Sequence, residues 1–140
     1  MTQARLGYQT FLQRGDGAAP ENFNTIIEIL TIKGPGAKVD MKDATNMSSV
    51  GQVKEIIAGL EDPGQVQVTF NWIPGDPQHA LVLADKSNKT LKNWKIVLPA
   101  VIGKTWSFAG YVSGFEPNYP VDDKITATMT IDLTGPSTLA

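Results

Sequence analysis

Alternation of apolar and polar residues at every second position is the feature that most constrains how this chain can fold. In the segment KITATMTIDLTG, residues 124–135, apolar side chains occupy positions 125, 127, 129, 131 and 133, and mostly threonine fills the places between them. Successive side chains of a β-strand point to opposite faces. This segment is therefore predicted to be a strand with one buried face and one wetter face.

The same alternation recurs in residues 65–72, 94–98 and 105–112. The segment FNTIIEILTIK, residues 23–33, is more continuously apolar, as is typical of a strand covered on both faces. With a further candidate at residues 8–14, the chain has six or more strands separated by clusters of Gly, Pro, Asn and Asp. The predicted fold is mainly β, a sandwich or a barrel.

One short α-helix is predicted at about residues 77–87. Asp76 is a good N-cap residue, and Pro77 suits the first helical position. Residues 52–60 are ambiguous. Their apolar residues fall at helical intervals, but glycines bracket the segment, and the sequence EDPG then leads straight into a strand. A helix and a β-hairpin with its turn at residues 61–64 are equally supported by these residues.

A long polar segment, at about residues 33–51, is punctuated by glycine and proline and is predicted to be a loop. A loop of this length in a compact domain usually has a function or is disordered.

Composition excludes several classes of function. A chain of 140 residues fits one domain. A net charge of −2 gives no basic excess for binding nucleic-acid phosphates. The absence of cysteine removes disulfides, thiolate metal sites and a cysteine nucleophile. No apolar stretch approaches the roughly 20 residues of a membrane helix, and the N-terminus does not resemble a signal peptide, so we expect a protein made in the cytoplasm.

No catalytic, cofactor or metal site is predicted. His79 is the single histidine and is expected at the surface or in a subunit contact. The tripeptide Arg14-Gly15-Asp16 is interpreted as a turn, and the adjacent pair Asp122-Asp123 as solvent-facing. Three tryptophans fall on apolar strand faces and are expected in the core rather than on a ligand platform: Trp72, Trp94 and Trp106.

The order of the segments from residue 64 to about residue 137 resembles the major tail tube proteins of long-tailed phages, with the lambda-like type closest. An aromatic strand ends in Trp-x-Pro-Gly-acidic, and a helix follows. A strand then ends in Leu98-Pro99, the next aromatic strand leads into Val112-Ser113, and a threonine-rich strand runs to Thr134-Gly135. The first motif, which forms the joint between strand, turn and helix, comprises Trp72, Pro74, Gly75 and Asp76.

The resemblance implies a single tail tube domain over residues 1–140, without the additional C-terminal immunoglobulin-like domain of the lambda-like relative. It favours the β-hairpin over the helix for residues 52–60 and implies that the strand–turn–helix joint is structural rather than catalytic. No enzyme activity and no cofactor are expected.

The function that the resemblance implies is self-assembly into hexameric rings, whose sheets join into one β-barrel and which stack into a tube. The implied partners are other copies of the chain, a tape-measure protein in the lumen, and tail-tip and tail-terminator proteins. DNA would pass through without specific binding, and no membrane is involved. The implied location is the tail of a virion assembled in the host cytoplasm.

The segment at residues 33–51 would be the arm between rings in this family. Its charges alternate in sign, which is compatible with complementary contacts between identical rings, and the candidate stacking residues are Lys38, Asp40, Lys42 and Asp43.

Two other functions remain as alternatives. A tail terminator, or another ring-forming tail protein of the same superfamily, would form rings without polymerising. A ligand-binding β-sandwich, such as a carbohydrate-binding module, would expose coplanar aromatic side chains.

Overall fold

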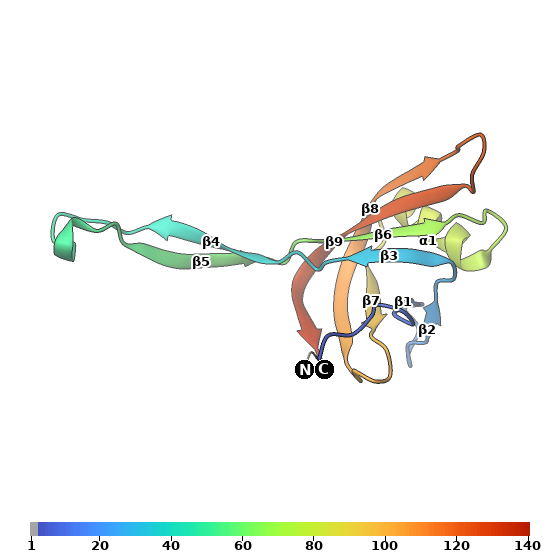
Figure 1. Ribbon diagram of the computed structural model, residues 1–140, viewed down its shortest axis with the longest axis horizontal. Coiled ribbons are helices and arrows are strands. Elements are labelled where there is room, and N and C mark those ends of the chain that lie inside the picture. The colour runs from blue at the N-terminus through green and yellow to red at the C-terminus, as the bar shows by residue number, and fades with distance from the viewer. Residues whose placement is uncertain (1–2) are drawn as a thin grey trace.

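The computed structural model describes residues 3–140 and confirms a mainly β fold (Figure 1). Seven strands form one antiparallel sheet in the order β2-β1-β7-β8-β9-β6-β3, and two more form a separate ribbon, β4-β5. The elements are β1 (Phe11–Gly15), β2 (Phe23–Thr25), β3 (Ile29–Lys33), β4 (Lys38–Asp43), β5 (Ile56–Asp62), β6 (Gln65–Asn71), α1 (Pro77–Asn88), β7 (Lys92–Val97), β8 (Thr105–Asn118) and β9 (Thr126–Leu139), with a short 3₁₀ turn at Val50–Gln52.

The period-two alternation builds the core. Strands β6 and β9 pair so that Val68 lies opposite Met129, and both side chains are fully buried. Because directly opposite residues share a face, this register places the three facing apolar pairs on the inner side: Val66 with Ile131, Val68 with Met129, and Phe70 with Ala127. Strands β7 and β8 extend the same inner face with Trp94 and Phe108.

The segment at residues 23–33 is two strands rather than the single strand predicted. The chain breaks at Glu28, which has a positive φ of 65°, so β2 pairs with β1 while β3 pairs with β6 at the opposite edge of the sheet. Ile26 is buried in the core, and its N–H donates to the Leu12 carbonyl at 2.9 Å. Ile27 and Leu30 are each 46% exposed, so the segment is not covered on both faces. The short connection between β2 and β3 therefore spans from one edge of the curled sheet to the other.

The predicted helix is confirmed as α1, which ends one residue beyond the predicted boundary. The Asp76 side chain accepts hydrogen bonds from the N–H groups of Gln78 and His79, at 3.1 Å each, and Pro77 occupies the first turn. The helix packs against β8, and Val82 is fully buried on its inner side.

Residues 56–62 form a strand, but the predicted hairpin turn at residues 61–64 is wrong. Strand β5 pairs with β4, and the chain continues from β5 into β6 without reversing (Figure 1). The reversal lies at residues 44–55, between β4 and β5. Residues 38–43 of the predicted loop are therefore strand.

Gly64, which suggested the turn, and Gly36 form the neck of this ribbon. Gly64 has a φ of 81°, and a Cβ at this position would collide with the Gly36 carbonyl. The Gly36 N–H donates to the Gln65 carbonyl at 3.2 Å. Glycine serves here for close approach of two backbones, a use that looks the same in sequence as a turn.

Candidate self-assembly surfaces

The motif Trp72-x-Pro74-Gly75-Asp76 forms a joint between β6 and α1. The Trp72 N–H donates to the Ile125 carbonyl at 3.1 Å, and its ring meets that of Phe115 edge-on, with centroids 5.4 Å apart. Asp76 caps α1. These contacts fix the direction in which the helix leaves the sheet.

His79 is fully buried beneath this joint, so its expected place at the surface or in a subunit contact is wrong. Its Nδ1 accepts from the Ile73 N–H at 3.0 Å, and its Nε2 lies 2.9 Å from the Ile27 carbonyl oxygen. Only the tautomer with the proton on Nε2 satisfies both bonds. The ring also packs on Phe70 at 4.8 Å between centroids. His79 thus ties α1 to the connection between β2 and β3.

Arg14 and Asp85 form a buried ion pair that sequence analysis missed. Arg14 lies in β1 rather than in the predicted turn, and its guanidinium donates to both carboxylate oxygens of Asp85, at 2.5 Å and 2.8 Å. Both residues are 5% exposed. The sequence contains a signal for this pair. Arg14 lies two residues from Leu12 and so on the same, inward face of the strand, and Asp85 lies three residues from Val82 and so on the same face of the helix.

Strands β4 and β5 form an arm, residues 38–62 including the turn, that projects from the body (Figure 1). Every residue of the two strands is exposed. Met41 lies opposite Ala58, and Asp43 lies opposite Ile56. Strand alternation puts Val39 on the same side, and Glu61 lies opposite Val39. This side, which we call the apolar face of the arm, therefore carries two charged residues, Asp43 and Glu61, among six.

The opposite face of the arm holds most of the predicted stacking residues. Lys42 and Asp40 bridge each other at 2.7 Å, and Lys38 lies opposite Asp62. Asp43 is separate from them, because it shares the apolar face. The Thr45 side chain and backbone N–H hydrogen-bond to Asp43 and lower the pKa of its carboxyl. The structure therefore brings Asp40 and Lys42 together and leaves Lys38 and Asp43 apart from that pair.

A second uncovered surface is the outer face of the sheet. On β6 and β9, polar side chains face each other in register, as in Gln67 opposite Thr130 and Thr69 opposite Thr128, whose hydroxyl oxygens are 3.4 Å apart. Strands β6, β8 and β9 contain no lysine or arginine. We call this surface the polar sheet face.

Within residues 3–140, no three His, Asp or Glu side chains are grouped so that they could hold a metal ion. No helix in the same range is long and apolar enough to cross a membrane.

Solved structures with this fold come from phage tails and related particles. A chain from the tail of an empty gene transfer agent (GTA) particle, refined with helical and C6 symmetry, matches with a TM-score of 0.79 and 11% identity, covering 98% of this chain and 99% of that one. A chain from the sixfold-symmetrised baseplate of the anti-feeding prophage (AFP) matches at 0.76 and 8% identity, covering 100% and 97%. The SPP1 tail tube matches at 0.74 and 12% identity, covering 97% and 78%.

Comparison of the sequence with family models identifies the family more specifically than the structural similarity does. No curated protein matches the chain. The family model described as lambda phage tail tube protein (TTP) matches residues 10–140, which is nearly the whole chain and includes the arm, the strand–turn–helix joint and the polar sheet face. The chain therefore belongs to the lambda phage tail tube protein family.

Proposed function

We propose that this protein self-assembles into hexameric rings that stack into a tail tube through which DNA passes. The observation that carries the proposal is the arm, a two-stranded ribbon in which every strand residue remains exposed among the described residues 3–140. An isolated hairpin is marginally stable in water. Its exposed apolar residues, including Met41, Ile56 and Leu60, gain burial when other copies cover them.

The polar sheet face is proposed to line the lumen. The charged residues of β6, β8 and β9 are Glu116 and Asp132, and both are acidic. Carboxylates repel phosphates, and a wall without basic side chains offers DNA no counter-charge. Such a wall lets DNA slide through without holding it.

The tube encloses a tape-measure protein before DNA enters, and it meets tail-tip and tail-terminator proteins at its two ends. The protein is a structural component of a virion, without enzyme activity, and is assembled in the host cytoplasm. One tail tube domain spans residues 1–140. Lys38, Asp40, Lys42 and Asp43 contribute to contacts between rings.

A ligand-binding module is less well supported than a tube subunit. Trp94 is buried, while Trp72 and Trp106 pack against the core. Sugar platforms need coplanar aromatic rings in solvent, and these three side chains do not supply one.

Negative-stain electron microscopy across a concentration series, combined with sedimentation velocity, tests the proposal. Stacked rings or tubes of uniform diameter are the expected result. Closed rings that never stack indicate a tail terminator instead. A protein that stays monomeric at every concentration, and also after tail-tip components are added, overturns the proposal.

A further inference from the structure

The side-chain chemistry that responds to mildly acidic pH is concentrated in one buried ring. The sequence contains a single histidine, His79, and no cysteine. Histidine is the side chain whose ordinary titration falls between about pH 5 and pH 8. His79 is also fully buried, although a surface position would let the ring gain and lose a proton freely. The response of this fold to mild acid is therefore decided by what surrounds His79.

Both nitrogens of the ring are engaged in a way that requires the neutral form. Nδ1 accepts from the Ile73 N–H at 3.0 Å, and Nε2 donates to the Ile27 carbonyl at 2.9 Å. A doubly protonated imidazole has two donors and no acceptor. A proton added at Nδ1 would point at the Ile73 N–H, so that two donors would face each other. The bond between the ring and the joint therefore cannot survive protonation.

The charged groups on the elements around the ring are carboxylates that bond elsewhere. On α1, the Asp76 carboxylate accepts from backbone N–H groups of the first turn, including that of His79. On the β2–β3 connection, the Glu28 carboxylate accepts from the Asn71 side chain at 2.9 Å. Strand β6 has no charged residue, and the charged residue of β8, Glu116, lies on the polar sheet face. Neither nearby carboxylate bonds the ring where it lies, so each can receive a protonated ring only after the ring has turned.

Polar contacts tie helix α1 to the body at two places. His79, in the first turn, joins the helix to the β2–β3 connection. Asp85, nearer the other end of the helix, pairs with the buried Arg14 of β1. The ion pair makes no use of the histidine ring, so only the first of the two ties depends on a neutral imidazole. Loss of that tie frees the first turn of α1 and leaves the far end of the helix in place.

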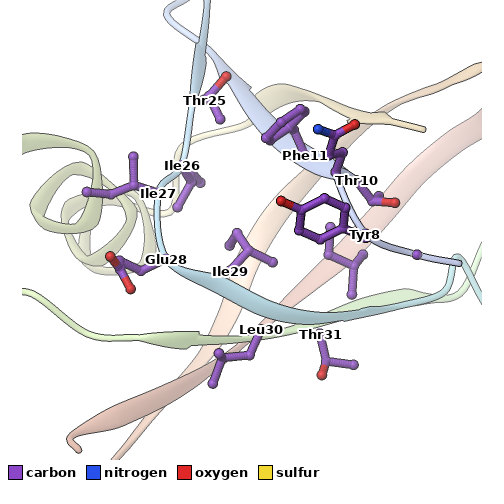
Figure 2. Close-up of a pocket in the computed structure, with 13 residues that line it drawn as sticks. Tyr8, Thr10, Phe11, Thr25, Ile26, Ile27, Glu28, Ile29, Leu30 and Thr31 are labelled. Carbon is purple, nitrogen blue, oxygen red and sulfur yellow. The ribbon is translucent and has the colours of Figure 1, made fainter. Parts of the chain in front are cut away.

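The β2–β3 connection keeps its own attachment to the sheet. The Ile26 N–H donates to the Leu12 carbonyl, and the Asn71 N–H donates to the Glu28 carbonyl, at 2.9 Å each. Figure 2 shows Ile26 and Glu28 on this connection, with Tyr8 across an apolar groove of about 800 Å³. Because these bonds do not involve the histidine, the segment that moves is the start of the helix and not the wall of the groove.

We propose that His79 is an acid-sensitive latch on the joint between β6 and α1. Uptake of one proton from water at Nδ1 breaks the bond from the Ile73 N–H, and the ring turns out towards the carboxylates of Asp76 and Glu28. The first turn of α1 then detaches, while the buried ion pair holds the rest of the helix. The positive N-terminal end of a helix also disfavours a cation in its first turn, which adds to the cost of keeping a protonated ring in place. The latch is a property of the folded subunit and does not depend on the proposed function.

Urea denaturation followed by tryptophan fluorescence tests the latch at about one pH unit above and one below 6.5, the ordinary histidine value. The unfolded chain takes up a proton on its histidine across this interval, whereas the latched ring does not. The equilibrium constant for unfolding is therefore expected to rise about tenfold from the higher pH to the lower. His79→Gln is the matched control, because glutamine does not titrate and retains a donor for the Ile27 carbonyl. Its unfolding constant is expected to change by less than about twofold, since the carboxylates common to both proteins ordinarily titrate near pH 4.

NMR of the ring nitrogens and of the Ile73 amide follows the opening itself, and a chain with one histidine gives one set of ring signals. Protonation of Nδ1 is expected to coincide with faster exchange of the Ile73 N–H, corrected for the intrinsic effect of pH. If the natural protein and His79→Gln show the same ratio of unfolding constants, the folded state accepts the proton at no cost and the latch is refuted. Protonation of Nδ1 without faster exchange refutes it as well, and this measurement decides the matter if His79→Gln does not fold. Either refutation leaves the proposed function standing.

Discussion

Replacing Asp85 by leucine tests whether the buried ion pair holds α1 to the sheet. Asp85 and Arg14 are both 5% exposed, and the guanidinium makes two hydrogen bonds to the carboxylate. Removing one partner leaves the other charge buried without compensation, which costs about 3–5 kcal/mol of the free energy of unfolding. For a chain of this size the melting temperature is expected to fall by roughly 10–20 °C.

Chemical denaturation followed by tryptophan fluorescence measures this loss, because Trp94 is buried beside the pair and lies opposite Arg14 in the β1–β7 register. Arg14→Met is the reciprocal single variant, and the double variant completes a thermodynamic cycle. Leucine and methionine of similar volume can pack together once both charges are gone. The double variant is therefore expected to be more stable than either single variant.

Two results would refute this reasoning. If the Asp85→Leu variant loses less than about 1 kcal/mol, water reaches the pair and it behaves like a surface salt bridge. If the double variant loses as much free energy of unfolding as the two single variants together, the side chains act independently and the pair does not hold α1 to the sheet.

Three further predictions concern other parts of the chain. Replacing both Met41 and Ile56 by glutamate is expected to abolish polymerisation seen by electron microscopy while leaving the free energy of unfolding within about 0.5 kcal/mol, since both side chains are exposed. Val121→Glu, at an exposed position between β8 and β9, is the control, and tubes formed by the double variant would contradict the role of the apolar face. His79→Ala is expected to cost about 1–3 kcal/mol in urea denaturation, because two partly buried backbone groups lose their partner. A neutral effect would show that the ring is dispensable. Hydrogen bonds from backbone N–H groups lower the pKa of the Asp16 carboxyl below its ordinary value of 3.8. The contribution of Asp16 to stability is therefore present above pH 3.8 and is lost as the pH falls through the lower pKa of the folded state. An NMR titration midpoint at or above pH 3.8 would contradict this.

Local signals in the sequence determined most of the sheet. The alternation in β6 and β9 predicted which side chains face the core, because a strand has only two faces and a register slip would bury threonine and glutamine. Asp76 and Pro77 predicted the start of α1, because capping satisfies backbone groups within a few residues of the cap. The family was also recognisable from the order of such segments.

Long-range pairing decided the rest. The same glycine and proline signals that mark a hairpin turn lie at the neck of the arm, and only the tertiary structure shows that β5 pairs with β4. Arg14 and Asp85 are separated by 71 residues, and no local rule brings a strand arginine and a helix aspartate together. The predicted exposure of His79 was wrong for the same reason, since its burial depends on the connection between β2 and β3.

The sequence by itself therefore determined a mainly β chain with one capped helix and the family to which it belongs. Tertiary structure decided where apolar side chains remain exposed, namely on the arm. The physical reason is that alternation specifies the two sides of each strand but not which strand lies next to it. A side chain becomes part of a core or of an interface only once distant segments have covered it or left it open.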